Sequence, residues 1–236
     1  MFVKLKKKIH LLQNIYIKNN YLFSKKSYAM DGEDIAINNF VEIKNDGFYL
    51  DVGAHHPLQR NNTFLLFKKG WKGINIDINE FSIDLFNFLR PKDTNIQTAV
   101  SDQVGEIIFY YQKDFSQLNT TDKKIAKQSF NNEFKEKIVK CETINNILEN
   151  SKYKDKKIDF LNIDIEGAEI KALNSLNFEK YSPTVICIEI LGYRDLDNVE
   201  REKEIKKDEI YLFLLEKGYK KVWSGPSYCS HLFVKN

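Results

Sequence analysis

The sequence has little glycine, proline or cysteine. Its 236 residues include 10 Gly, 4 Pro and 3 Cys, beside 17 Phe and 12 Tyr. This composition is typical of a folded globular chain and excludes a low-complexity or disordered protein. The three cysteines, Cys141, Cys187 and Cys229, are scattered and lack metal-type spacing, so a disulfide framework is excluded. A reducing compartment fits such cysteines, and we expect a cytoplasmic protein.

Long apolar runs are also missing. No run is long enough to span a bilayer, and Gln13 and Asn14 interrupt the apolar residues that a signal peptide would need. Residues 1–27 nevertheless predict a basic amphipathic helix in front of a domain at 28–236. Its apolar residues recur at helical spacing, namely Leu5, Ile9, Leu12 and Tyr16. The helix either packs on the domain with its lysines in water, or makes peripheral contact with the inner face of the cell membrane.

An excess of positive charge is absent from the body of the chain. The formal net charge is +3, but residues 1–30 hold seven lysines and no acid, which leaves 29 basic and 33 acidic residues, or −4. A body close to neutral gives no electrostatic case for nucleic-acid binding. We therefore expect no nucleic-acid partner.

Phosphate-binding glycine motifs are lacking as well. A dinucleotide site needs Gly-x-Gly-x-x-Gly after its first strand, whereas the apolar stretch 48–52 runs into a turn with Gly53 alone, and a Walker-type loop is absent. A ligand with ribose and adenine but no phosphate fits better. Asp77 ends another strand 24 residues after Gly53, about where an acid binds ribose hydroxyls.

Strands and helices alternate along the chain. Expected strands cover 48–52, 74–78, 95–100, 158–165 and 184–190, with a terminal pair at 219–223 and 231–235. This order predicts an α/β fold with a doubly wound, mostly parallel sheet, whose ligand lies beyond the carboxyl ends of the strands. Several acids and one glycine occur at or just past those ends: Asp51, Gly53, Asp77, Asp102, Asp164, Glu166 and Glu189.

Some elements carry more specific expectations. Asp31 can cap a short helix, Pro57 suits a first helical position, and 199–217 reads as one helix that ends at Gly218. A strand at 107–111 is expected to form a hairpin-like pair with 95–100. The polar segment 112–135 is weakly patterned, so we expect it to be functional or mobile.

Five motifs, in this order, resemble the FkbM family of S-adenosylmethionine-dependent methyltransferases over about residues 28–235. They are Gly32-Glu33-Asp34, the turn from Asp51 to Pro57, Gly70-Trp71-Lys72-Gly73 leading to Asp77, Ala99-Val100-Ser101-Asp102 with Gly105, and Ile163-Asp164-Ile165-Glu166-Gly167. The resemblance implies a class I methyltransferase fold, Rossmann-like with a seven-stranded sheet. It also implies S-adenosylmethionine as cofactor and O-methylation, often of a sugar, nucleotide-sugar or glycan hydroxyl in cell-surface polysaccharide or glycolipid assembly.

The resemblance also implies roles for particular residues. Asp51, Gly53 and Ala54 would line the methionine end of the cofactor, and Asp77 would bind the ribose. Ser101 and Asp102 would lie by the adenine, whereas Asp164, Glu166 and Gly167 would form the floor beside the methyl group. Glu33 is either a further cofactor-binding residue or a first-turn helix residue. The sequence departs from the family pattern in two places. His55 and Pro57 stand where many relatives have Asn and Gly, and Asn162 stands where a lysine is common.

A sugar hydroxyl needs a base to become a good nucleophile. His55 or His56 can serve near neutral pH, and Asp164 or Glu166 can serve if burial raises the pKa. The histidine pair has an alternative role in capping and packing. We expect no metal, although Asp164, Glu166 and His56 are an alternative divalent-metal set.

Other functions stay open at this stage. The chain could be a non-catalytic cofactor-binding or interaction subunit, or could methylate a small molecule other than a sugar. Trp71, Trp223, Tyr228 and segment 112–135 could shape an acceptor pocket, or the aromatic residues could belong to the core.

Overall fold

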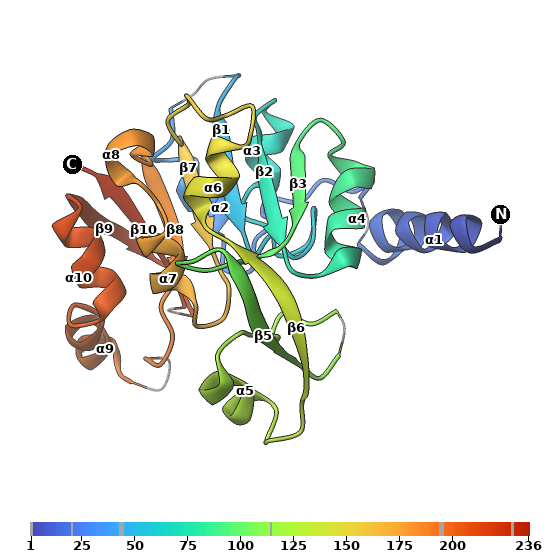
Figure 1. Cartoon of the computed structure of the whole chain (residues 1–236). Helices are drawn as coiled ribbons and strands as arrows, with labels where there is room; N and C mark the ends of the chain where they lie inside the picture. The colour runs from blue at the N-terminus through green and yellow to red at the C-terminus, as the bar shows by residue number, and fades with distance from the viewer. Residues whose placement is uncertain (1, 20, 43–44, 114, 194–195, 228) are drawn as a thin grey trace.

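The structure is a computed structural model that describes residues 2–19, 21–42, 45–113, 115–193, 196–227 and 229–236. A seven-stranded sheet forms its centre, and helices cover both faces of the sheet (Figure 1). The strands are β1 (Phe48–Val52), β2 (Lys72–Asp77), β3 (Thr94–Gln97), β7 (Phe160–Ile163), β8 (Val185–Glu189), β9 (Tyr219–Ser224) and β10 (Ser230–Lys235).

The strand order is β3-β2-β1-β7-β8-β10-β9, and all neighbours are parallel except the pairs that involve β10. The doubly wound, mostly parallel sheet predicted from the sequence is therefore confirmed. From β1 the chain winds outward through β2 to β3, and β7 later returns to the other side of β1. Such a reversal leaves a crevice at the carboxyl ends of the central strands.

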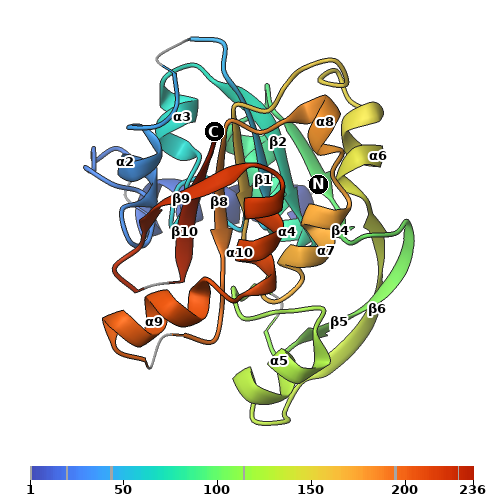
Figure 2. The ribbon, with the colours of Figure 1, turned by 90° about the vertical axis from the view of Figure 1, so that its left-hand side faces the viewer.

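Helices lie on both sides of the sheet (Figure 2), and two layers of apolar side chains hold them there. Alternate residues of β1 face opposite sides: Phe48, Leu50 and Val52 join the layer under α6, α7 and α10, and Tyr49 joins the layer under α2 and α3. The helices are α2 (Glu33–Ile37), α3 (Phe64–Lys68), α4 (Glu80–Leu89), α6 (Ile144–Glu149), α7 (Glu169–Asn174), α8 (Phe178–Tyr181), α9 (Asn198–Ile205) and α10 (Glu209–Glu216).

A second, three-stranded sheet lies beyond the carboxyl ends of the main strands (Figure 1). It contains β4 (Ala99–Val100), β6 (Lys135–Glu142) and β5 (Gly105–Tyr111), and α5 (Lys123–Ser129) lies in the connection. The predicted pairing of 107–111 with 95–100 is wrong, because β5 runs antiparallel to β6. The stretch 95–100 is itself divided between β3 and β4, which belong to different sheets.

Three helix expectations are also wrong. Gly32 occupies the N-cap of α2, and the Asp31 carboxylate accepts instead from the Ser227 N–H at 2.9 Å. Pro57 is not helical, since α3 begins only at Phe64. The stretch 199–217 is two helices, because Asp208 interrupts the first and caps α10 by accepting from the Ile210 N–H.

The N-terminal segment forms α1 (Phe2–Leu12) and continues as a π-helix, η1 (Gln13–Lys18). Leu11 and Ile15 are buried against Leu85 of α4. The residues of the predicted apolar stripe are exposed, and Leu5, Ile9 and Leu12 lie on the other side of the helix, whereas the Tyr16 ring also contacts Phe88 of α4. Among the residues described, no helix is both long and apolar enough to cross a membrane.

Candidate active site

A cavity of about 350 Å³ opens at the carboxyl ends of β1, β2, β7 and β8. This size falls within the range of small-molecule pockets in proteins. The predicted site residues that line it are Glu33, Asp51, Gly53, Ala54, His55, Asp77, Asp164 and Glu166. The crevice expected from the topology is thus the place where most of the predicted residues converge.

Gly53 lets the chain turn sharply at the end of β1. Its φ is 82°, and a Cβ added there would lie 1.7 Å from the backbone oxygen of Asp164. The Gly53 and Ala54 N–H groups both donate to the Ile76 carbonyl at 3.0 Å. Only glycine combines this conformation with this approach, so the turn fixes the backbone that lines the cavity.

Asp77 lies at the end of β2 and lines the cavity. Its carboxylate accepts from the backbone N–H of His55 at 2.8 Å and of Asn79 at 2.7 Å. Burial raises the pKa of Asp77 to about 6, although both hydrogen bonds lower it. The carboxylate is therefore held in a fixed position with lone pairs left for hydroxyl groups of a ligand.

Asp51 is fixed from several sides. Thr63 Oγ1 donates to its carboxylate at 2.9 Å and Asn162 Nδ2 at 2.9 Å, and Asn61 Nδ2 lies at 3.3 Å. Burial raises the pKa of Asp51, whereas the nearby Arg90 guanidinium and the three donors lower it. Asn162, which stands where a lysine is common in the family, orients the Asp51 carboxylate.

Arg90 is a site-supporting residue that sequence analysis missed. Its side chain is fully buried and donates to Thr63 Oγ1 at 2.8 Å, to Asn61 Oδ1 at 2.8 Å and to the Pro57 carbonyl. It thereby ties the turn after β1 to the end of α4. An arginine before a proline at a helix end carries no sequence signal for this role.

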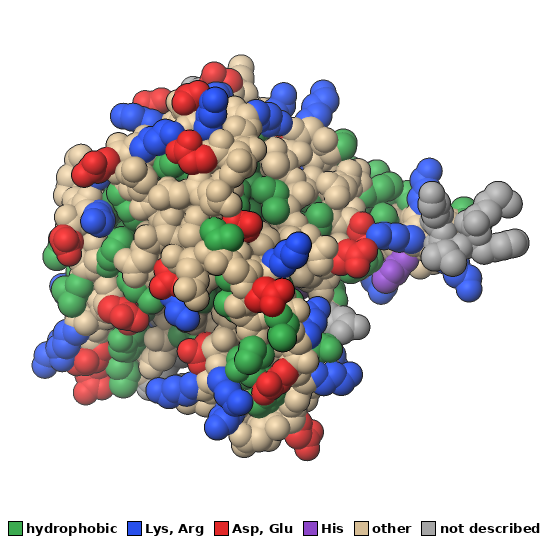
Figure 3. Space-filling model, viewed as in Figure 1, with side chains coloured by type: hydrophobic (Ala, Val, Ile, Leu, Met, Phe, Trp, Pro, Cys, Tyr) green, Lys and Arg blue, Asp and Glu red, His purple; other side chains and the backbone are tan. Residues whose placement is uncertain are grey.

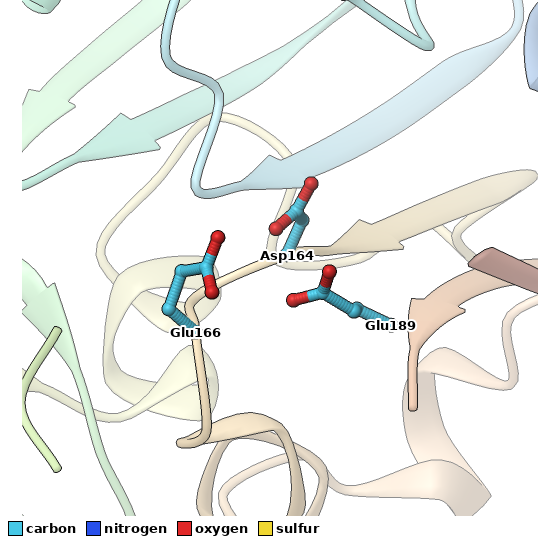
Figure 4. Close-up of side chains that lie close together, drawn as sticks. All are labelled: Asp164, Glu166 and Glu189. Atoms are coloured by element: carbon cyan, nitrogen blue, oxygen red, sulfur yellow. The ribbon is translucent and has the colours of Figure 1, made fainter. Parts of the chain in front are cut away.

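Three carboxylates converge on one side of the cavity (Figure 4). Asp164 follows β7, Glu166 lies two residues later, and Glu189 ends β8; one oxygen of each lies within 4.8 Å of the others. The Asp164 side chain is exposed to the cavity and Glu189 is half-buried. Loss of solvation by the enclosing protein first, and then the neighbouring carboxylates, raise the pKa of both well above the usual values. The sequence placed Glu189 at a strand end but did not predict its part in this group.

The two neighbouring histidines lie in different places, and only His55 lines the cavity. His55 lines the cavity with φ 49°, and its ring stacks on Phe115 with centroids 4.5 Å apart. Burial and the charge of Arg60 lower the pKa of His55 to about 4, so the ring is neutral at pH 7. Its role as a base stays a prediction.

His56 is buried away from the cavity. Its Nδ1 accepts from the backbone N–H of Leu58 and Gln59 at 3.0 Å, and its Nε2 lies 2.8 Å from Asn14 Oδ1. Burial lowers the pKa of His56 to about 3. The structure therefore gives His56 the capping and packing role that was the alternative for this pair, because its basic nitrogen is already occupied.

At the far end of the cavity the lining differs from expectation. Ser101 and Asp102 do not line it; Ser101 Oγ bonds Asp102 Oδ1 at 3.1 Å. The preceding residues Thr98, Ala99 and Val100 line it instead. On the opposite side Glu33 reaches the cavity, and its carboxylate accepts from the Asp31 N–H at 2.7 Å while burial raises its pKa.

The first part of segment 112–135 covers the cavity, and seven of its residues, 115–121, line it. Thr120 is anchored twice: its backbone pairs with Tyr110, and its Oγ1 donates to the Glu166 carbonyl at 2.5 Å. Arg60 donates to Gln117 Oε1 across the mouth. We name residues 115–121 the cover loop.

The aromatic residues considered for an acceptor pocket lie elsewhere. Trp71 is buried in the core under β1, and Trp223 is half-buried against the same apolar layer. Tyr228 lies outside the described residues.

The chain matches a family model described as the methyltransferase FkbM domain over residues 51–221. A search of curated proteins found no match. Among solved structures, the methyltransferase FkbM from Methylobacillus flagellatus has a TM-score of 0.50 at 11% identity, covering 98% of this chain and 60% of its own. The present chain thus spans about three fifths of that protein's length.

Two further solved structures are similar at lower scores. A TehB-like SAM-dependent methyltransferase from Corynebacterium glutamicum has a TM-score of 0.45 at 11% identity, with 100% of both chains covered. An O-methyltransferase from Bacillus cereus in complex with SAH has a TM-score of 0.45 at 13% identity, covering 96% of this chain and 91% of its own. At these identities the likeness concerns the fold.

Proposed function

This chain belongs to the FkbM methyltransferase family, and from that premise we propose that it is an S-adenosylmethionine-dependent O-methyltransferase acting on a sugar hydroxyl. The observation that carries the proposal is the cavity itself. It brings a bare glycine turn, a fixed aspartate at the second strand end and a group of carboxylates to one place.

The lining residues fit the cofactor. The close backbone turn at Gly53 and Ala54 leaves room for the methionine part, and the Asp77 carboxylate is placed for the ribose hydroxyls. Ile78, Ala99 and Val100 offer an apolar surface for adenine. The lack of a phosphate-binding loop agrees with a ligand that has no phosphate.

When bound, S-adenosylmethionine supplies a methyl group on a positively charged sulfur. The protein has to align the acceptor oxygen with that methyl and take up the hydroxyl proton. Asp164 and Glu166 lie beside the Gly53 turn, and the raised pKa of Asp164 makes its carboxylate a stronger base than an ordinary aspartate. A positioned base of this kind contributes roughly 10²–10⁴-fold in rate.

Polar side chains in the cavity lining favour a polyhydroxylated acceptor. They include Arg60 and Asn62, and Ser116, Gln117 and Asn119 of the cover loop. Hydroxyl and amide groups bind sugar hydroxyls through paired donors and acceptors. The substrate class we propose is thus a sugar, nucleotide sugar or glycan.

Calorimetric titration with S-adenosylhomocysteine tests the cofactor site. The wild-type protein should bind in the micromolar range, and Asp77→Asn should bind at least tenfold more weakly. Asp102→Asn is the matched control, because it changes a strand-end acid outside the cavity, and it should bind like wild type. A folded wild-type protein without binding would remove the basis of the proposal.

A methyl-transfer screen then tests the acceptor. Nucleotide sugars and surface glycans are incubated with labelled S-adenosylmethionine, beside small phenols and carboxylic acids. Label transfer to a sugar supports the proposal. Transfer only to a non-sugar compound would correct the acceptor, and cofactor binding without any transfer would favour a non-catalytic subunit.

A further inference from the structure

Asp164, Glu166 and Glu189 form the tightest group of carboxylates in the cavity. They come from the ends of two neighbouring parallel strands, and their side chains point toward one another (Figure 4). We name them the acidic trio. Like charges this close repel one another, and after the larger effect of lost solvation the neighbouring carboxylates raise the pKa of Asp164 and of Glu189.

Glu189 adds an independent observation. Its Oε2 is buried and accepts no hydrogen bond from any residue that the structure describes. Buried carboxylate oxygens are normally paired, since burial without a partner is costly. The unsatisfied oxygen belongs to a side chain directed at Asp164 and Glu166, so a positively charged ligand between them would satisfy it.

The turn that carries Glu166 is fixed. The Glu169 carboxylate accepts from the Ile165 N–H at 3.0 Å and the Gly167 N–H at 2.9 Å, and Thr120 holds the Glu166 carbonyl. These hydrogen bonds fix the backbone that carries Glu166, so the geometry of the trio is set before any ligand binds.

We propose that the acidic trio binds a hard divalent cation of the Mg²⁺, Mn²⁺ or Ca²⁺ class. All three ligands are carboxylate oxygens, which these ions prefer, and no histidine or cysteine takes part. His56, the nitrogen ligand considered from the sequence, is replaced by Glu189. Because Asp164 and Glu166 line the cavity, the remaining coordination positions of such an ion would face the cavity.

Cation binding itself does not depend on the proposed methyl transfer, but its role does. A cation here would bind the acceptor hydroxyl together with an adjacent oxygen and hold both near the cofactor site. This deepens the proposed substrate class to sugars with two neighbouring oxygens, such as a vicinal diol.

Electron paramagnetic resonance of Mn²⁺ tests the site without any turnover, since bound Mn²⁺ leaves the free-ion signal. We expect one ion per chain, displaced by excess Mg²⁺ or Ca²⁺, and at least tenfold weaker binding in Glu189→Gln and Asp164→Asn. Asp77→Asn is the control and should bind Mn²⁺ like wild type. Absence of uptake at millimolar Mn²⁺, or unchanged uptake in both trio variants, would overturn the proposal.

Binding of S-adenosylhomocysteine separates this proposal from the previous one. Glu189→Gln should keep the nucleoside ligand and lose Mn²⁺, whereas Asp77→Asn should do the reverse. Retained ligand binding also shows that Glu189→Gln is folded. A protein that binds S-adenosylhomocysteine but no cation contradicts only the cation site.

A separate observation concerns the surface of α1 and η1. Leu5, Ile9, Leu12 and Tyr16 are 54%, 44%, 39% and 37% exposed, and their spacing puts them on one face, which we name the N-terminal stripe. The helix projects from the body with lysine side chains around it (Figure 3). Lys7, on the opposite side, pairs with Asp84 at 2.5 Å, so Leu5, Ile9 and Leu12 face away from the domain. Tyr16, at the end of the stripe, also contacts Phe88 of α4 edge-on.

From the stripe we infer that α1 and η1 dock on an anionic lipid surface. The positive charge around the stripe is complementary to an anionic membrane, because residues 1–30 contain seven lysines and no acid. A helix with this arrangement lies in the bilayer interface with its apolar face inward. The lipid phosphates would then meet the flanking lysines.

Vesicle co-sedimentation tests this inference. The protein should bind vesicles of phosphatidylglycerol and phosphatidylcholine in equal parts, and binding should fall at high salt. The double variant Leu5→Ser with Ile9→Ser should lose most binding, whereas Val104→Ser, another exposed apolar residue at 59% exposure, should not. No binding to anionic vesicles, or a stripe-dependent dimer in light scattering instead, would overturn it.

Discussion

Position 53 requires glycine for two reasons, a left-handed φ and a close approach to the backbone of Asp164. The energetic cost of each can be measured separately by substitution. Gly32 has a similar φ of 84° but open space where a Cβ would be, whereas the Cβ of Gly53→Ala would collide with Asp164. We expect Gly32→Ala to cost about 1 kcal/mol of the free energy of unfolding and Gly53→Ala about 2–4 kcal/mol. Urea denaturation measures both; equal costs would show that the approach to Asp164 is unimportant.

Asp77 predicts a pH dependence of ligand binding. Burial raises its pKa to about 6 without ligand, and ribose hydroxyls donate best to the ionised carboxylate. Affinity for S-adenosylhomocysteine should therefore be constant above that pH and fall by about tenfold per unit below it. Titrations from pH 8 down to pH 5 measure this, and Asp77→Asn should show a flat profile. A fall of the same size in Asp77→Asn would assign the effect to another group.

The positions of site residues were predicted where local sequence determines them and missed where tertiary contacts do. Gly53 and Asp77 follow from strand-end position alone, and both line the cavity. For His56 the sequence left catalysis and packing open, and its contact with Asn14, 42 residues away, decided between them. The part of Arg90 likewise depends on distant partners.

Among the elements, the cover loop has the clearest link to the site. Phe115 stacks on His55 and meets Phe81 edge-on, so it joins the loop to the turn after β1 and to α4. Phe115→Ala should weaken S-adenosylhomocysteine binding by roughly threefold to tenfold, the worth of a lost aromatic contact. Phe134→Ala, which removes a ring that packs on Tyr110 away from the cavity, should leave affinity unchanged. Calorimetry on both variants checks this, and equal affinities would show that the loop contributes little.

The ends and pairing of helices and strands were likewise predictable where local sequence determines them and not where distant contacts do. Local sequence determines both ends of helix α4 (Glu80–Leu89), because the Asn79 side chain caps its start and Pro91 follows its end. The break between α9 and α10 was missed, although Asp208 is a good N-cap residue, because the charged stretch around it continues a helical pattern. Pairing of β5 with β6 joins residues about thirty apart, which no local pattern reveals.

At the scale of the molecule, the carboxylates of the cavity make stability depend on pH. Loss of solvation in the cavity raises the pKa values of Asp77, Asp164 and Glu189, so each exceeds its value in the unfolded chain. The folded state therefore binds protons more strongly, and the ligand-free protein loses stability as the pH rises from about 4 through these raised values. Thermal midpoints in chelator-containing buffer should fall from pH 5 to pH 8, less steeply in Asp164→Asn. Equal slopes in the two proteins would contradict this.

The position of β10 between β8 and β9 has a consequence for folding kinetics. Strand β9 is synthesised before β10, but its place in the sheet is beyond β10, so it has no neighbour to pair with until β10 exists. Strand β8 likewise waits for its second partner, while β1, β2 and β3 can assemble from a contiguous stretch of sequence. Completion of the sheet is thus a late event that needs chain segments far apart in sequence, and contacts of this kind slow folding. During that interval β8, which bears Glu189, exposes an unpaired strand edge to other chains.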